Sequence, residues 1–432
     1  SHGIAPERWS YGLTVMLEKV AGLALVNKLR AILLMEADFN FHNKLVFGNR
    51  MLDVARAGGV IPEEQFAEKQ STAEDGKWYN VLVTDVSRQK RLTLIQISAD
   101  AANCYDRIHH TIMSLAFAAA RVHRGSIRAM LWAIQTMKFF LRTGWGESTL
   151  FIGGVLGVIF HGMCQGNGAA PAAWLLLSSL LVNIYKSLGH GSYFTSPITF
   201  LSNEAMGVLF VDDTDLIIMH QSLTSADQIW MAGQEALIVW GALLIATGGN
   251  LKPEKCHYSI ADYRCVDGKW EYTEMVDWRK LYVPQPDGST AEIKQIPVTE
   301  SKKTLGLYSN IAGCYKKQVS VLVDRVEEWT NRLEAGKLPA HWAWTSYFVQ
   351  LWARLRYGLG TNGSSVEELV DLEAERPSTQ PRPDTEPAVP MAPLSARPDP
   401  PASGPPAPKP TRVETLQSLY RCMLPRLGFN RN

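Results

Sequence analysis

The pattern of apolar and polar positions in the middle of the chain predicts a β-hairpin that carries two adjacent acids. An apolar run from Met206 to Val211 leads into Asp212 and Asp213, and a second apolar run covers Leu216 to Met219. Two short apolar runs separated by turn-forming residues are typical of hairpins. Adjacent carboxylates at a hairpin tip repel one another unless cations share the site. Asp also bonds its own backbone in ordinary turns, so this motif alone leaves a plain turn open.

A second part of the pattern places another acid at the end of a strand. Residues 92–99 are apolar and predict a buried strand, and Asp100 follows it, while the apolar positions of 108–119 suit a helix. If this strand and the hairpin are neighbours in one sheet, Asp100 meets Asp212 and Asp213. Three carboxylates without a nearby His or Cys suit Mg²⁺ or Mn²⁺. A pair of such ions is a common device for nucleotidyl transfer.

Further elements are predicted on either side of this core. Residues 1–90 mix helical patterns with a turn at Gly58-Gly59 and a polar loop at 71–77. Ser225 and the apolar periodicity after it predict a capped helix up to residue 246 that packs under the sheet. Residues 257–300 alternate aromatic and charged positions, which favours a β-rich insertion or an extended hairpin. Helical patterns return over 312–335 and 339–357.

The last part of the chain has a different composition. Of the 23 prolines, 13 lie between residues 377 and 410. Such a segment cannot form a helix or a sheet, so we expect residues 372–411 to be a disordered or polyproline-II linker. Helical periodicity returns over residues 413–427.

Composition limits the class of protein without naming a function. A chain of 432 residues with 46% apolar content can bury a large core and form two or three subdomains. No apolar stretch reaches 18 residues, so we expect no membrane span. The six cysteines lack CxxC spacing, which argues against a zinc site or a disulfide framework and fits a reducing compartment. The formal net charge of +1 is low for a nucleic-acid binder, although basic residues can be concentrated in one channel.

The motifs, taken in order, resemble those of a reverse transcriptase of the non-LTR retrotransposon type, over roughly residues 8–365. The F-V-D-D segment is similar to the family's aromatic-x-Asp-Asp motif. The other segments that resemble family motifs are 28–34, 63–73, 100–106, 162–174, 247–256 and 305–307. Three positions depart from the family pattern: Ala170 replaces Ser, Cys164 replaces a basic residue, and no Pro follows Arg30.

The resemblance implies an α+β fold, a right-hand polymerase with fingers, an antiparallel-sheet palm and a helical thumb. Fingers would occupy residues 1–90. The palm, with an inserted fingers segment and the β-rich insertion, would occupy 91–308, and the thumb 309–371. The linker at 372–411 and a C-terminal helical tail at 412–432 would follow. Because the chain begins at Ser1 rather than Met, we expect a fragment of a longer element protein.

The resemblance also implies the catalytic residues and the metal. Asp100 and Asp212 would bridge two Mg²⁺ ions, with Mn²⁺ as a substitute, and Asp213 would be a weaker ligand whose side chain points the other way if the backbone is extended. Arg30 would clamp the triphosphate with its guanidinium fork. Lys255 would assist the departure of pyrophosphate, or else be a solvated loop lysine.

Two further motifs would contact the nucleotide and the template. Gln165 and Gly166 would lie near the nascent base pair, where a missing side chain permits close backbone approach. The alternative is a plain turn before a helix opened by Pro171. The ring of Tyr105 would lie under the incoming sugar and exclude a 2′-hydroxyl, unless it is simply a core tyrosine. We expect structural roles for His109 and His110, and a solvated or capping role for Asp215.

The predicted function is therefore RNA-templated DNA synthesis, with an RNA template, a DNA or RNA primer and dNTPs as partners. The place of action would be intracellular, in the cytoplasm or the nucleus. Two alternatives remain open. One is a catalytically decayed remnant that binds nucleic acid, and the other is an RNA-dependent RNA polymerase. RNA polymerases of this type commonly carry Gly before the Asp pair, where this chain has Val211. The oligomeric state stays unknown.

Overall fold

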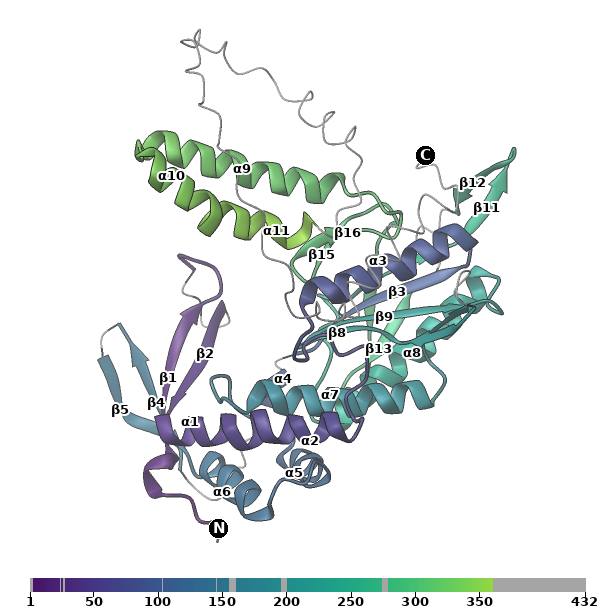
Figure 1. Ribbon diagram of the computed structural model, residues 1–432. Coiled ribbons are helices and arrows are strands. Elements are labelled where there is room, and N and C mark those ends of the chain that lie inside the picture. Colours follow the sequence, from purple (N-terminus) through teal and green to yellow (C-terminus); the bar gives the residue numbers. More distant parts are fainter. Residues whose placement is uncertain are drawn as a thin grey trace, which may run out of the picture. The chain divides into compact units, whose positions relative to one another are not determined.

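The computed structural model describes residues 3–23, 25, 28–102, 104–144, 146–154, 161–195, 200–273 and 279–359 (Figure 1). The chain divides into two units, Ser1–Ser365 and Val366–Asn432, and the described residues all belong to the first. The predicted proline-rich linker at 372–411 and the tail at 412–432 lie outside the described residues.

A mixed sheet of eight strands forms the centre of this unit. β3 lies between two antiparallel neighbours, β10 and β9, and β8 pairs with the start of β9. The other strands extend the sheet on both sides. Their bounds, in spatial order, are β13 (Leu281–Pro284), β14 (Thr290–Gln295), β10 (His257–Ala261), β3 (Leu94–Asp100), β9 (Asp213–His220), β6 (Ser192–Thr195) and β7 (Ser202–Ala205), with β8 at Gly207–Phe210.

The prediction of an antiparallel sheet is wrong for two of these pairings. β10 and β14 are parallel, and so are β6 and β9. Each of these pairs is separated in sequence by other elements, which gives the chain enough length to return in the same direction. The strand predicted at 92–99 and the hairpin predicted around Asp212 are both confirmed.

Alternation along the strands directs side chains to two separate clusters. In β9, Leu216 and Ile218 belong to the main core, whereas Ile217 and Met219 belong to a smaller cluster with Leu94 on the other face. Period-two alternation produces this division, because successive side chains of a strand point to opposite faces. The sheet is therefore buried on both faces.

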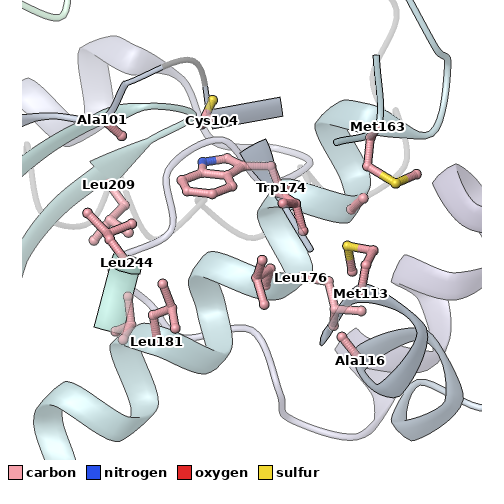
Figure 2. Packing of buried hydrophobic residues seen from close by; sticks show 14 of the residues in the cluster. Ala101, Cys104, Met113, Ala116, Met163, Trp174, Leu176, Leu181, Leu209 and Leu244 are labelled. Atoms are coloured by element: carbon pink, nitrogen blue, oxygen red, sulfur yellow. The ribbon is translucent and has the colours of Figure 1, made fainter. Parts of the chain in front are cut away.

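The main core lies between the sheet and two long apolar helices, α7 (Ala170–Ser187) and α8 (Ala226–Ala246). Figure 2 shows Trp174, Leu176 and Leu181 of α7 within the buried cluster that also contains Leu209 and Leu244. Ser225 caps α8 through a capping box with Gln228, and Gly233 lies against Ile95 of β3. The predicted capped helix under the sheet is confirmed.

Length and composition alone would allow α8 to cross a membrane, and among the described helices only α8 passes that test. Its buried side chains, which include Leu237 and Trp240, pack in the core of the unit. A core helix with this composition passes the same test without spanning a bilayer.

The opposite face of the sheet is covered by α3 (Ala73–Lys90), with Val83 packed against Leu94 and Ile217 in the smaller cluster. The prediction of a polar loop at 71–77 is wrong, because α3 begins within this segment. The side chain of Thr72 accepts a hydrogen bond from the backbone N–H of Asp75, and the Asp75 carboxylate accepts one from the backbone N–H of Thr72. This capping box starts a helix in a segment whose composition is typical of a loop.

Residues 1–57 contain more strand than predicted. β1 (Tyr11–Glu18) pairs with β2 (Leu29–Met35) and with β4 (Lys138–Thr143), which pairs with β5 (Gly146–Gly153). These strands are partly exposed along their length, so they lack the clean alternation that marks a strand in sequence. A long helix follows β2 in three segments: α1 (Ala37–Asn43), a π-helical stretch (Lys44–Arg50) and α2 (Met51–Ala57).

Shorter helices complete the body. A 3-10 turn (Glu7–Ser10) precedes β1, and α4 (Cys104–Arg107), α5 (His110–Ala119) and α6 (Arg124–Gln135) follow β3. Two hairpins form two-stranded sheets of their own. They are β11 (Tyr263–Val266) with β12 (Lys269–Tyr272), and β15 (Lys302–Thr304) with β16 (Leu307–Ser309).

The predicted helices after residue 312 are present. α9 (Lys316–Gly336) is followed by α10 (Ala340–Ser346), a π-helical stretch (Tyr347–Trp352) and α11 (Ala353–Leu359). The side chain of Gln318 in α9 accepts a hydrogen bond from the backbone N–H of Tyr308 in β16. This helical segment is therefore joined to the β15–β16 hairpin, which lies beside the central sheet.

Candidate active site

The last residue of β3 and the first residue of β9 bring two of the predicted acids together. Asp100 is the Cα partner of Asp213 in the antiparallel β3–β9 pair. Phe210 of β8 also pairs with Asp213, so Val211 and Asp212 form the turn of the β8–β9 hairpin. Val211 has φ of +58°, a left-handed conformation that β-branched residues rarely adopt. The turn therefore carries backbone strain next to both aspartates.

Asp100 and Asp213 line one cavity of about 220 Å³, here called the aspartate pocket. Alternation explains their shared orientation. Asp213 and Asp215 are an even number of residues from Ile217 in β9, and Asp100 is an even number of residues from Leu94 in β3. Their side chains therefore point to the same face as Ile217 and Leu94, the face covered by α3. The complete lining comprises Ser98, Ala99, Asp100, Val208, Asp213, Asp215, Lys255, His257, Lys303, Thr304, Leu305 and Gly306.

The charges in this pocket are unevenly compensated. The Lys255 Nζ lies 3.1 Å from Asp100 Oδ2, in an ion pair at the surface. Burial raises the pKa of Asp213 from the usual 3.8 to about 6, and the charges of Asp212, Asp215 and Asp100 add to the rise, while Lys255 opposes it. Like charges close together disfavour ionisation in this way. A cation arriving in the pocket would therefore relieve repulsion around Asp213.

Asp212 and Tyr105 lie beside the pocket rather than in its lining. Burial raises the pKa of the half-buried Tyr105, and the nearby charges of Cys104 and Asp212 raise it further. Tyr105 belongs to α4, which directly follows β3, so the aromatic ring stays near the end of that strand. The charge of Asp212, the chain neighbour of Asp213, therefore acts on the tyrosine of α4.

The prediction that Asp215 has a solvated or capping role is wrong. Its side chain is buried, and Asn80 Nδ2 donates a hydrogen bond of 2.7 Å to Asp215 Oδ2. The physical reason is its position in β9, two residues after Asp213 and on the face covered by α3. A carboxylate at that point must find partners inside the protein.

Gln165 and Gly166 lie at the junction between β2 and the segment before α7. The backbone carbonyl of Gln165 accepts a hydrogen bond of 2.7 Å from the N–H of Leu33, and its N–H donates to Asp106 Oδ1. Gly166 has φ of +117°, and a Cβ there would lie 2.1 Å from the Leu33 carbonyl oxygen. The close approach that needs glycine is therefore to β2 itself.

The alternative prediction for the segment around Gly166 is a plain turn before the next helix. α7 begins at Ala170, with Pro171 in its first turn, as that alternative requires.

Arg30 is an exposed residue of β2, paired through the backbone with Leu17 of β1. Within the described part of the chain, no hydrogen bond or ion pair involves its side chain. Neither Arg30 nor the Gln165-Gly166 pair contributes to the lining of the aspartate pocket. The predicted set is thus divided: Asp100, Asp213 and Lys255 line the aspartate pocket, and Asp212, Tyr105, Arg30, Gln165 and Gly166 do not.

The acids are not arranged as a finished metal centre. Across the described ranges, no group of three or more His, Cys, Asp or Glu side chains lies close enough to hold a metal ion. The donor chemistry of Asp100 and Asp213 suits a hard cation, and the Lys255 ammonium stands beside Asp100 as a positive partner. Coordination by all three predicted aspartates would require their side chains to rearrange.

Several lining residues were not singled out in the sequence. His257 follows Lys255 at the start of β10, and Lys303 and Thr304 belong to the β15–β16 hairpin. No local signal marks them, because they reach the pocket only through the pairing of β10 with β3 and the placement of that hairpin. The histidines after α4 have structural contacts, as expected. His110 Nε2 lies 2.7 Å from the Gly162 carbonyl oxygen, and His109 packs against His161.

The similarity to known proteins is weak and is limited to solved structures. No family model matches the sequence, and no curated protein matches it. Among solved structures, apo telomerase from Candida tropicalis, truncated from its C-terminal domain, is similar at a TM-score of 0.39 and 12% identity, over 62% of this chain and 56% of that one. Telomerase from Candida albicans in complex with a fragment of telomeric RNA gives 0.39 and 11%, over 75% of this chain and 50% of that one.

The chain thus spans about half the length of these telomerases. Their identities of 11 and 12% and their low TM-scores assign this chain neither a family nor an activity.

Proposed function

We propose that this chain is an RNA-templated DNA polymerase of a retroelement, acting by two-metal nucleotidyl transfer at Asp100, Asp212 and Asp213. The observation that carries the proposal is the pairing of Asp100 with Asp213 across β3 and β9, which brings two residues 113 positions apart in the chain to one pocket. Right-hand polymerase architecture, with fingers at 1–90, palm at 91–308 and thumb at 309–371, is part of the same proposal.

The charge of the pocket supports this function. When bound, two Mg²⁺ ions would activate the primer 3′-hydroxyl and stabilise the departing pyrophosphate. An added cation would relieve the repulsion around Asp213, whose pKa is raised to about 6 by burial and by its acidic neighbours. Asp100 would exchange its partner, the Lys255 ammonium, for that cation. Lys255 would then be free to approach the phosphates of the nucleotide.

Residues outside the pocket have supporting roles in the proposal. Tyr105, held near Asp212 by α4, would select the sugar, and Arg30 on exposed β2 would hold the triphosphate. Gln165 accepts a backbone hydrogen bond from Leu33 of β2, and Gly166 packs against the Leu33 carbonyl, so a movement of that strand would be transmitted to both residues. The partners would be an RNA template, a DNA or RNA primer, and dNTPs, within the cell.

A primer-extension assay tests this function directly. The purified chain is given an RNA template annealed to a primer, with dNTPs and Mg²⁺, and extension is compared with the Asp212→Asn variant. The variant keeps the shape of the residue and removes one charge, so extension should fall by orders of magnitude while the fold is retained. Its thermal stability should stay equal or rise, because repulsion at the hairpin tip is relieved.

Binding of the metal has its own readout. Mn²⁺ titration followed by electron paramagnetic resonance should show weaker binding in the Asp212→Asn variant than in the parent, whether or not the parent extends primers. Normal extension by the variant would exclude the proposed catalytic assignment. A folded parent that binds template and Mn²⁺ but extends nothing would favour the decayed remnant.

A further inference from the structure

A fully buried lysine lies beneath the aspartate pocket and has no place in the mechanism above. Lys77, in the first turns of α3, is 1% exposed. Its Nζ donates a hydrogen bond to the hydroxyl of Thr304, which lines the pocket. Burial lowers the pKa of Lys77 to about 8, and the negative charge of Asp215 opposes that shift. A lysine this deeply buried requires partners that compensate for its lost hydration.

The acidic partner belongs to the strand that carries Asp213. Asp215 is 4% exposed and faces α3, where Asn80 donates a hydrogen bond to it. Asn80 and Lys77 are three residues apart on one helix, so they lie on the same face of α3. That face therefore presents an ammonium and an amide to the side of β9 on which Asp213 also lies.

The other partner belongs to the opposite wall of the pocket. Thr304 ends β15, and Leu305 and Gly306 form the turn into β16 with φ of +51° and +80°. All three residues line the aspartate pocket. From α11, the hydroxyl of Tyr357 donates a hydrogen bond to the Leu305 carbonyl oxygen. The hairpin is thus held from outside by α11 and from inside by Lys77.

We propose that Lys77 is a positioning residue for the aspartate pocket: it holds Thr304 with its ammonium, on the same face of α3 as the Asn80 that holds Asp215, and so fixes the β15–β16 hairpin relative to Asp100 and Asp213. The catalytic consequence rests on the proposed function, whereas the Lys77–Asp215 link does not. Opposite charges buried near each other often stabilise a fold less than well-packed apolar side chains of similar volume. Fold stability alone is therefore a poor reason for a charge pair at this point, and a role in the pocket accounts for it better.

A double-mutant cycle tests the link without any activity. Lys77→Met keeps the length of the side chain but removes the buried positive charge near Asp215, so the urea midpoint of unfolding should fall clearly. Adding Asp215→Asn removes the unpaired charge while keeping an amide for Asn80, so the double variant should regain a large part of that loss. Losses that simply add in the double variant would overturn the proposed pairing.

Single-nucleotide extension tests the positioning role. With the template–primer prebound, Lys77→Met should lower kcat at least tenfold while leaving the Kd for template–primer within about twofold, because alignment is disturbed and the nucleic-acid surface is not. Thr304→Val removes only the hydroxyl that Lys77 holds, and it should lower kcat in the same direction even if Lys77→Met does not fold. The matched control is Lys90→Met on the same helix, whose lysine donates to the Thr195 carbonyl oxygen away from the pocket.

The outcomes separate the two proposals. Parental kcat in both Lys77→Met and Thr304→Val, with both folded, would exclude the positioning role. An inactive parent would count against the proposed function instead, and the stability cycle would then decide the Lys77–Asp215 link alone.

Discussion

Asp213 is the acid on which the surroundings act most clearly. In a free chain its carboxyl would ionise near pH 3.8, whereas burial and the charges of Asp212, Asp215 and Asp100 raise its pKa to about 6 in the folded protein. Between these two pH values the folded state holds the proton more firmly than the unfolded chain does. The free energy of unfolding that depends on this group therefore decreases as the pH rises from about 4 to about 6.

Asp213→Asn should remove this pH dependence. We expect the variant to gain stability relative to the parent as the pH rises from 4 to 6, with a constant difference above pH 7, because an amide has no proton to release there. Urea unfolding of both proteins at low ionic strength, at pH 4, 5, 6 and 7, measures the difference. Parallel curves for the two proteins would show that Asp213 titrates normally.

Tyr105 allows a second test at the scale of single residues. If its ring excludes a 2′-hydroxyl, Tyr105→Ala should accept ribonucleotides far more readily relative to deoxyribonucleotides. Steric discrimination of this kind can amount to several kcal/mol, at about 1.4 kcal/mol for each factor of ten. Competing rNTP and dNTP in single-nucleotide extension gives the ratio, with Tyr105→Phe as the control that retains the ring. An unchanged ratio in the alanine variant would bring the RNA polymerase alternative back.

At the scale of elements, the junction between β2 and the start of α7 depends on one glycine. Gly166 adopts φ of +117°, and the Leu33 carbonyl oxygen lies where a Cβ of residue 166 would be. The adjacent Gln165 carbonyl accepts a hydrogen bond from the Leu33 N–H. The N-terminal strands are thus joined by backbone hydrogen bonding to the segment that precedes α7. Glycine is required there by a contact with this protein's own backbone.

Gly166→Ala should destabilise the protein far more than a left-handed glycine does on average. Gly189→Ala is the matched control, since Gly189 has φ of +84° with no atom near the added Cβ. Strain alone should cost the control about 1–2 kcal/mol. Gly166→Ala adds a clash with backbone, so its loss should exceed that range, and amide exchange should accelerate at Leu33. Equal losses in both variants in urea unfolding would contradict the contact.

At the scale of the whole molecule, the aspartate pocket is assembled from distant stretches of one compact unit. Its lining comes from four stretches: residues 98–100, Val208 with Asp213 and Asp215, Lys255 with His257, and residues 303–306. The proline-rich stretch belongs to the other unit, Val366–Asn432. The proline content of this stretch predicts that it can be removed without unfolding the unit that holds the aspartate pocket.

Deletion of residues 377–410 should leave the unfolding of the remaining protein unchanged. A segment so rich in proline cannot bury enough apolar surface to offset the entropy of ordering it. We expect a thermal midpoint within about 2 °C of that of the parent, since a change of 1 kcal/mol in the free energy of unfolding shifts the melting temperature of large domains by about 2–4 °C. Differential scanning calorimetry and primer extension of the deletion variant check both the fold and the activity. A clear drop in the midpoint would mean that this stretch packs against the body.

The amino-acid sequence by itself determined the local elements around the acids. Apolar runs and turn residues were enough for β3 and for the β8–β9 hairpin, and a capping box was enough for α8, because these signals act between neighbours in the chain. The partly exposed strands β1 and β2 were missed since they bury no regular alternate face.

Tertiary structure decided what surrounds the acids. The sequence predicted that Asp100 and Asp213 meet only on the condition that their strands are neighbours, and the pairing of β3 with β9 fulfils that condition. The burial of Asp215 against Asn80 and the burial of Lys77 depend on which helix covers those strands. Such contacts join residues more than 100 positions apart, so their energies appear only when the sheet is assembled. Local propensity cannot encode them, because each side chain alone would equally suit a solvated surface.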